Sequence, residues 1–229
     1  MSTFVIGDLH GCLDALKTMV KFANITENDT LITLGDVVDR GPSSAAIIDW
    51  LIARHQVAPT VSLLGNHEIM MMRSRFSPSE FNDWLLYGGR ETLASYGTEI
   101  ITIIPTKHWD FLDHTCVDYH ELTHHFCVHA AVNPLLSLPQ QPEIILFWEK
   151  LQIPPKPHQN GKIMICGHTA QKNGLPYLTP TTICLDTWCY GGGWLTALQL
   201  ETGQLYQTRE SGETRTLAYV APTHPPNFV

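Results

Sequence analysis

The chain has 229 residues and a mass of 25.7 kDa, enough for one α/β domain with a large buried core. Hydrophobic residues make up 44% and charged residues 16% of the sequence, a composition that argues against both a disordered chain and a membrane protein. Lys and Arg number 14 against 22 Asp and Glu, so the net charge is −8, which argues against binding to a nucleic acid duplex.

The cysteines and the N-terminus both point to a cellular interior. The six cysteines contain no CxxC pair, and a chain of this length needs no disulfide framework, so we expect free thiols in a reducing compartment. The first residues, MSTFVIGDLHG, have no basic region and only a short apolar run, which is not the pattern of a signal peptide. No stretch approaches a transmembrane span. We therefore expect a cytoplasmic protein without a membrane partner.

The N-terminal third alternates between strand and helix patterns. Three apolar runs, FVI, LITL and VSLL, each end in Gly followed by Asp8, Asp36 or Asn66. Helical patterns separate them, and the runs are about 30 residues apart, the length of a βαβ unit. This predicts a β-α-β-α-β opening with parallel strands. Ligand sites lie beyond the carboxyl ends of such strands, so these polar residues are expected to line one crevice.

Shorter helices are expected in the middle of the chain. Residues 78–96 resemble two helical segments broken at the Gly88-Gly89 pair, and residues 106–114 resemble a third segment. Another short helix is expected around residues 143–150, between Pro-rich loops.

The C-terminal half adds further strands. The runs HFCVHA, IMICGH and TICLD end in polar residues as the first three runs do. After Thr182, the runs ICLDT, WLTALQL and QLYQT predict antiparallel strands that close a second sheet. We expect one domain over residues 1–208 and a C-terminal tail over 209–229.

Three motifs at the first strand ends carry the chemistry: GDLHG, GDVVDRG and GNHE. Each alone fits an ordinary turn or helix cap. Together they supply the carboxylate, amide and imidazole groups that two divalent cations need for phosphoester cleavage. Two histidines that follow later apolar runs, in VHA and CGHT, fit the same set. The predicted metal ligands are Asp8, His10, Asp36, Asn66, His129 and His168.

Each ligand has an expected role. Two cations about 3.5–4 Å apart need an anionic bridge, for which Asp36 is the candidate. Asp8 and His10 would converge on the first ion, while Asn66 would give the second ion a neutral amide oxygen. A water between the ions becomes hydroxide near neutral pH, so in-line attack on phosphorus needs no protein nucleophile and no phosphoenzyme is expected.

The remaining motif residues have catalytic and binding roles. Asp39 can orient the imidazole of His67 and raise its pKa, so these two residues are the predicted general-acid pair. Arg40 carries a permanently charged planar guanidinium that suits a fork of hydrogen bonds to phosphate oxygens, and it is the predicted substrate clamp.

The order GDxHG, GDxxDRG, GNHE, VHA and GHT resembles the phosphoprotein phosphatase branch of the calcineurin-like metallophosphoesterases, over about residues 3–200. The stretch GGRETLASYG at residues 88–97 is similar to the bacterial type, which includes the bacteriophage lambda serine/threonine phosphatase and the symmetrical diadenosine tetraphosphatases. The resemblance implies a four-layer α/β/β/α sandwich with mixed sheets and a dinuclear site at one edge. It implies the same ligand, acid and arginine assignments.

Two positions depart from the family pattern. A second substrate-binding arginine usually follows a tryptophan by two positions, whereas this chain has Lys150 after Trp148, which offers a point charge without the bidentate fork. The final motif often reads LDTG, whereas this chain has Trp188 in the glycine's place. Trp188 either narrows the entrance or stacks on an aromatic leaving group, or it simply fills a loop.

The sequence leaves the substrate open between two enzymes. The leading expectation is a serine/threonine protein phosphatase, and the alternative is a symmetrical bis(5'-nucleosyl)-tetraphosphatase. A non-catalytic phospho-binding scaffold is disfavoured because no expected ligand or acid is missing. The ligand set favours two Mn²⁺ ions, with Fe²⁺ or Zn²⁺ also compatible. The expected partners are a phosphorylated protein or a small phosphoester or nucleotide.

Overall fold

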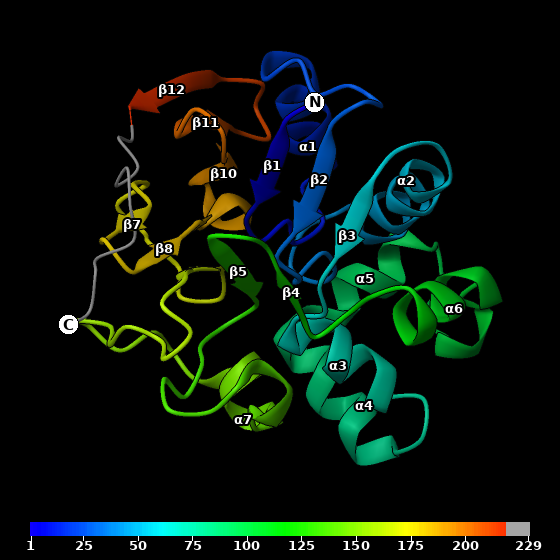
Figure 1. Ribbon diagram of the computed structural model, residues 1–229. Coiled ribbons are helices and arrows are strands. Elements are labelled where there is room, and N and C mark those ends of the chain that lie inside the picture. Colours follow the sequence, from blue (N-terminus) through cyan, green and yellow to red (C-terminus); the bar gives the residue numbers. More distant parts are fainter. Residues whose placement is uncertain (219–229) are drawn as a thin grey trace.

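The computed structural model describes residues 1–218, which form two packed sheets flanked by helices (Figure 1). The first sheet has the order β12-β11-β10-β1-β2-β3, and β9 pairs with β10. Its strands are β1 (Thr3–Ile6), β2 (Thr30–Thr33), β3 (Thr60–Ser62), β9 (Asp186–Thr187), β10 (Trp194–Gln199), β11 (Gln204–Thr208) and β12 (Thr214–Ala218). The second sheet has the order β4-β5-β6-β8-β7. Its strands are β4 (Tyr119–Glu121), β5 (His125–Val128), β6 (Ile163–Cys166), β7 (Tyr177–Leu178) and β8 (Thr182–Cys184).

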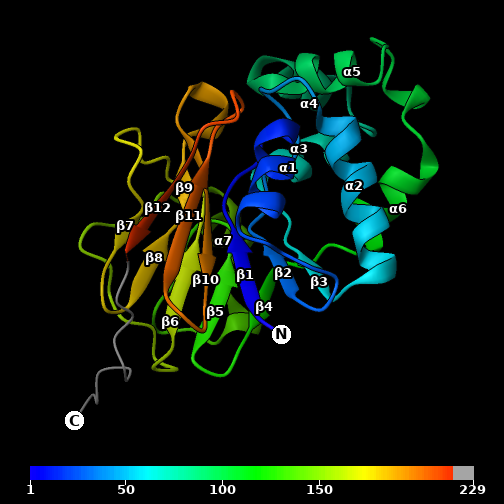
Figure 2. The ribbon, with the colours of Figure 1, turned by 90° about the horizontal axis from the view of Figure 1, so that it is seen from above.

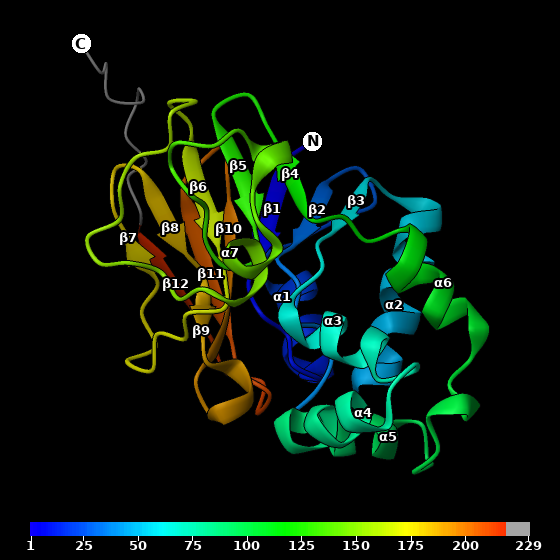
Figure 3. The ribbon, with the colours of Figure 1, turned by 90° about the horizontal axis from the view of Figure 1, so that it is seen from below.

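Most helices gather on one side of the first sheet (Figure 2), whereas α7 packs on the second sheet and meets α3 through the ion pair between Arg73 and Glu143 (Figure 3). The α-helices are α1 (Leu13–Phe22), α2 (Ser44–Val57), α3 (Asn66–Arg73), α4 (Pro78–Trp84), α5 (Arg90–Ser95), α6 (Thr106–His114) and α7 (Glu143–Trp148). The π-helical turn η1 (Leu85–Gly89) links α4 to α5, and three short 3₁₀ turns are η2 (Ile101–Ile103), η3 (Leu138–Gln140) and η4 (Cys189–Gly191). No helix within residues 1–218 is long and apolar enough to cross a bilayer.

Alternation along the strands builds the layers. Phe4 and Ile6 of β1 pack with the α1 and α2 side of the core, whereas Val5 packs between the two sheets. In the second sheet, Cys127 of β5 faces the first sheet and Phe126 packs toward α7. The expected four-layer α/β/β/α sandwich is therefore confirmed.

The expected opening is confirmed too. β1 pairs with β2 and β2 with β3, both in parallel, and α1 and α2 form the two crossovers. The helix predicted over 106–114 is α6, and the break predicted at Gly88-Gly89 falls in the turn η1.

The placement of the last strands was predicted wrongly. β10 and β11 do not close a second sheet, because β10 pairs with β1 in antiparallel register and extends the first sheet. Of the runs after Thr182, only β8 joins the second sheet, and it lies parallel to β6. The predicted tail began at residue 209, but Thr214–Ala218 form β12 against β11, so this part belongs to the sheet. Residues 219–229 of that tail lie outside the described residues.

Candidate metal centre and phosphate site

The strand-end loops converge at the carboxyl edge of β1, β2 and β3. The backbone N–H groups of Leu9 and His10 donate to the carbonyl of Asp36 at 3.1 and 2.8 Å, which ties the first loop to the second. In the second sheet, the N–H of Gly167 donates to the carbonyl of His129 at 2.8 Å. These bonds join the loops after β1 and β2 to each other, and the loops after β5 and β6 to each other, at the strand ends where the strand pattern predicted the polar residues.

The loops are held in uncommon backbone conformations. Among the described residues, seven non-glycine residues have positive φ, and all but Asn24 belong to the predicted site. Gly167 has a separate reason for its identity: a Cβ there would lie 1.9 Å from Oδ1 of Asp8. Such strain persists only where the surroundings enforce it, and it commonly marks a functional site. The six strained residues of the predicted site are His10, Asp36, Asp39, Arg40, His168 and Trp188.

Two clusters of ligand atoms share Asp36. His10, Asp36 and His67 place ligand atoms within 4.8 Å of one another, and Asp36, His129 and His168 do the same. Asp36 Oδ2 is 3.4 Å from His10 Nε2, and its Oδ1 is 3.4 Å from His129 Nε2. One carboxylate thus presents one oxygen to each cluster, which is the arrangement of a bridging ligand.

Backbone carbonyls fix which nitrogen of each imidazole is free. Nδ1 of His10 lies 2.9 Å from the carbonyl of Val38, and Nδ1 of His129 lies 2.8 Å from that of Leu34, so these carbonyls assign the proton to Nδ1. His168 is held the other way round, with Nε2 3.2 Å from the carbonyl of Trp148. In all three rings, the nitrogen that remains unprotonated faces Asp36 or Asn66.

Beside the second cluster, hydrogen-bond acceptors of Asn66, His129 and His168 face one another. Asn66 Oδ1 lies 3.1 Å from His129 Nε2 and 3.0 Å from His168 Nδ1, and the assigned protons leave a lone pair on each of these atoms. Burial lowers the pKa of His10 to about 3 and that of His168 to about 4, so both rings are neutral at pH 7. Neutral imidazoles and an amide oxygen that converge in this way fit a divalent cation, which would offset their repulsion.

Asp8 and Asp186 add buried negative charge beside this set. The carboxylate of Asp8 accepts the backbone N–H of His168 at 3.2 and 3.0 Å, and it lies outside both clusters defined above. Burial and the neighbouring charge of Asp186 raise the pKa of Asp8. Burial likewise raises the pKa of Asp186 to about 6, with a further contribution from Asp36. The sequence interpretation assigned no role to Asp186, although it follows the run TICL as Asp8 follows FVIG.

The predicted general-acid pair is assembled. Nδ1–H of His67 donates to Oδ2 of Asp39 at 2.7 Å, and both side chains are buried. Burial lowers the pKa of His67, but the carboxylates of Asp36 and Asp39 outweigh this and leave it raised overall. A raised pKa favours the protonated imidazole, which is the form that a general acid requires.

Glu68 was missed as a structural member of the site. This fully buried carboxylate accepts the backbone N–H groups of Asp36, Val37 and Val38 at 2.7, 2.8 and 3.1 Å, and that of Gly65 at 2.7 Å. It therefore joins the loop after β2 to the start of α3. Its position in the GNHE motif was the available signal, but its partners are backbone groups that no residue type reveals.

A pocket of about 590 Å³ opens over the cluster and contains Arg40, His67, His168 and Lys150 among its lining residues. Arg40 and Lys150 are both exposed, so two cations border the space above the predicted metal ligands. Trp188 does not line this pocket. Its ring packs against Gly191, lies 5.1 Å from the Lys172 ammonium and stands edge-on to the Tyr190 ring, so its role toward the substrate stays a prediction.

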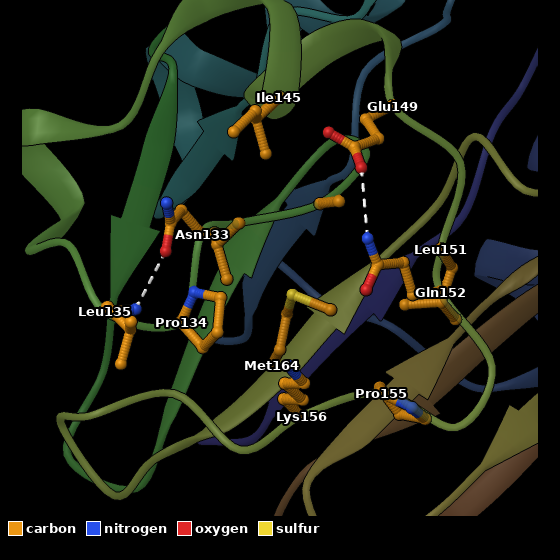
Figure 4. Close-up of a pocket in the computed structure, with 12 residues that line it drawn as sticks. Asn133, Pro134, Leu135, Ile145, Glu149, Leu151, Gln152, Pro155, Lys156 and Met164 are labelled. Carbon is orange, nitrogen blue, oxygen red and sulfur yellow. Dashed lines mark hydrogen bonds between the residues drawn. The ribbon is translucent and has the colours of Figure 1, made fainter.

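A second pocket, of about 280 Å³, lies away from this chemistry (Figure 4). Its lining is mostly apolar, with Leu135, Ile145, Leu151 and Met164 drawn around it, and no histidine or aspartate takes part. Its charged lining residues are Glu149 and Lys156, and none of the predicted metal ligands or catalytic residues lines it.

Known proteins share both the sequence pattern and the architecture. The chain matches the calcineurin-like phosphoesterase family over residues 1–195. A symmetrical bis(5'-nucleosyl)-tetraphosphatase from Yersinia pestis (strain Pestoides F) is 39% identical over 74 residues, which cover 31% of this chain. The match spans only 25% of that protein's length.

Two solved structures share the fold. A protein provisionally described as a diadenosine tetraphosphatase superposes with a TM-score of 0.67 at 19% identity, covering 94% of this chain and 92% of the other. A protein serine/threonine phosphatase from Saccharomyces cerevisiae superposes with a TM-score of 0.61 at 18% identity, covering 99% and 82%. Because the family match covers most of the chain, this protein belongs to the calcineurin-like phosphoesterases, a family that implies divalent metal ions.

Proposed function

We propose that this protein is a serine/threonine protein phosphatase that works with two divalent ions, Mn²⁺ being the first candidate. The observation that carries the proposal is Asp36, shared by two ligand clusters, beside a histidine backed by an aspartate and an exposed arginine. That combination serves phosphoester cleavage and has no purpose in a simple binding module. The proposed ligands are Asp8, His10, Asp36, Asn66, His129 and His168.

The chain's own residues have distinct tasks in this proposal. Bound ions would withdraw charge from the phosphate oxygens and acidify a water molecule. Arg40 binds the phosphate, and its guanidinium is steadied by the Tyr190 ring at 4.7 Å from the ring centroid. His67 protonates the departing oxygen, and Asp39 holds its ring through Nδ1. Lys150 adds a second positive charge at the pocket.

The surface beside the cluster supports an extended substrate. The pocket over the cluster shares Arg40 with a hollow of about 550 Å³ that is also lined by Leu86, Tyr87 and Arg90. It shares Arg73 with a third hollow of about 320 Å³. Three adjoining hollows give room for a polypeptide on both sides of a phosphorylated residue.

The test of this function is hydrolysis of a phosphoserine peptide by metal-stripped protein supplied with Mn²⁺. We expect release of inorganic phosphate with Mn²⁺ and none with the chelator alone. Turnover of the peptide that needs no metal, or none with Mn²⁺, Fe²⁺ or Zn²⁺, would contradict the proposal. A peptide that carries unphosphorylated serine is the control for contaminating phosphate.

A symmetrical dinucleoside tetraphosphatase is the second candidate. It is favoured by the 39% identity to a relative of that name and by Arg40 and Arg90 in one hollow, where they offer two cations to successive phosphates. Diadenosine tetraphosphate with Mn²⁺ should then yield two ADP, identified by chromatography. Efficient formation of two ADP with no phosphate from the peptide would replace the first candidate by this one.

A further inference from the structure

The segment GGRETLASYG, residues 88–97, supplies none of the proposed metal or phosphate ligands, yet it packs on the loop that carries Asp39. Thr92 of α5 donates its hydroxyl to Oδ1 of Asp39 at 2.6 Å. Trp84, at the end of α4, donates its indole N–H to both carboxylate oxygens at 3.0 Å. Both side chains are fully buried. Asp39 thus has two buried donors besides His67.

Thr92 holds the backbone of Asp39 as well as its side chain. The Asp39 N–H donates to Oγ1 of Thr92 at 2.9 Å and to Oγ of Ser44 at 3.1 Å. One hydroxyl therefore accepts from the main chain and donates to the carboxylate of the same residue. This is a fixed geometry for a residue whose φ is +69°.

Two glycines let this segment approach so closely. A Cβ at Gly88, where φ is +122°, would lie 2.6 Å from the backbone nitrogen of Arg40 and 2.9 Å from Cβ of Asp39. A Cβ at Gly89 would lie 2.4 Å from the ring of Trp84. The turn η1 thus brings the end of α4 and the start of α5 onto one carboxylate.

We propose that Trp84 and Thr92 are positioning residues that hold the Asp39 carboxylate so that His67 presents its free nitrogen to the departing oxygen. This rests on the proposed function. Asp39 has no exposed surface, and each of its carboxylate oxygens receives two hydrogen bonds from His67, Trp84 and Thr92. Loss of the Trp84 or the Thr92 donor removes part of this restraint, which lets the carboxylate turn. The His67 ring then loses its orientation. Proton transfer to the departing oxygen becomes slower, whereas the affinity for the substrate stays the same.

The effect depends on how much the leaving group needs a proton. Phenyl phosphate and p-nitrophenyl phosphate are similar in size, but phenoxide is the poorer leaving group and depends more on a general acid. For Trp84→Phe and Thr92→Val we expect kcat on phenyl phosphate to fall about tenfold or more, and kcat on p-nitrophenyl phosphate by no more than about threefold. KM should stay unchanged on both.

The experiment is steady-state kinetics on the full chain loaded with Mn²⁺. Thr92→Ser keeps the hydroxyl and should recover most of the phenyl phosphate activity. Trp109→Phe in α6 is the matched control, because Trp109 packs on Arg75 at 4.4 Å and is remote in its contacts from Asp39, so it should behave as wild type. Circular dichroism confirms that each variant is folded. If Trp84→Phe does not fold, the comparison of Thr92→Val with Thr92→Ser decides the result.

Equal losses on the two substrates, a rise in KM alone, or no recovery in Thr92→Ser would overturn the positioning role in an active protein. A wild type that hydrolyses neither phosphate with any metal would instead overturn the proposed function, and this inference with it. The two failures are therefore distinguishable in one set of assays.

Discussion

Two kinds of buried carboxylate lie next to each other in this site. Asp39 receives donors from His67, Trp84 and Thr92, which satisfy both of its oxygens. Asp8 and Asp186 each receive one backbone N–H, from His168 and Trp188, and no Lys or Arg within residues 1–218 pairs with either. The protein's own donors satisfy the carboxylate of Asp39. Asp8 and Asp186 instead carry excess negative charge, which a bound cation would neutralise.

The largest effect should come from removing the shared ligand. Asp36→Asn takes away the bridging charge while keeping the side-chain size, so both ions should bind weakly. We expect phosphatase turnover with Mn²⁺ to fall on the order of a thousandfold. The surface variant Asp49→Asn, remote from both clusters, should keep full activity. If Asp36→Asn turned over substrate about as fast as wild type, the carboxylates of this site would not need a cation, and their contrast with Asp39 would be wrong.

The next largest effect belongs to the acid. His67→Asn should lower kcat by about 100- to 10,000-fold on substrates with poor leaving groups, because an asparagine side chain cannot donate a proton to the departing oxygen as the imidazolium does. Mn²⁺ binding, measured by calorimetry, should change little. His55→Asn is the control, since His55 contacts Ser62 and takes no part in the site. A His67→Asn variant that loses its metals would instead make His67 a ligand, as its place in the first cluster allows.

Asp186 gives a pH-dependent test of the unsatisfied charge. Its pKa of about 6 in the folded chain exceeds its ordinary 3.8, so the folded state holds this proton more tightly than the unfolded state does. The protonated Asp186 therefore adds to the free energy of unfolding. This contribution is complete below pH 3.8 and is lost as the pH rises to 6. In metal-stripped protein, Asp186→Asn should therefore be more stable than wild type by roughly 2–3 kcal/mol above pH 6, and equal to it near pH 4.

Chemical denaturation of both chains at the two pH values measures this difference. Saturating Mn²⁺ should shrink it, because a bound cation neutralises the same charge. A wild type that is more stable than Asp186→Asn at pH 7 without metal would contradict the argument that the protein leaves this charge uncompensated.

The smallest effect should come from the rim of the pocket. Lys150→Arg replaces a point charge by a bidentate fork, and we expect KM for phosphate monoesters to fall about two- to fivefold with kcat unchanged. The nearby Lys156→Arg, which lines the other pocket, is the control. Unchanged Michaelis constants on every substrate would show that Lys150 does not bind the phosphate.

Much of the fold was predictable because it rests on local patterns. The apolar runs about 30 residues apart identified β1, β2 and β3, and their parallel order follows from the helices between them. The partner of β10 was not predictable in the same way. An alternating run specifies a strand but not its neighbour, and β10 pairs with β1, which lies near the opposite end of the chain.

In the candidate site, too, the features set by local sequence were predictable and those set by contacts between distant segments were not. Short motifs predict Asp36, the other proposed metal ligands and the proposed acid His67, because each strand end places several polar groups together. The contacts of Thr92 and Trp84 with Asp39 span 53 and 45 residues, so only the folded chain reveals them. The left-handed backbone of Trp188 and its packing against Gly191 were not predictable either, because they depend on the turn that the folded chain forms there.

The most direct test of the account is a titration of metal-stripped protein with Mn²⁺ by isothermal calorimetry, with p-nitrophenyl phosphate turnover measured on the same samples. The account predicts two ions per chain and turnover that rises from undetectable to its full value as both sites fill. Turnover by the stripped chain that Mn²⁺, Fe²⁺ and Zn²⁺ leave unchanged, or two bound ions without any turnover, would contradict it.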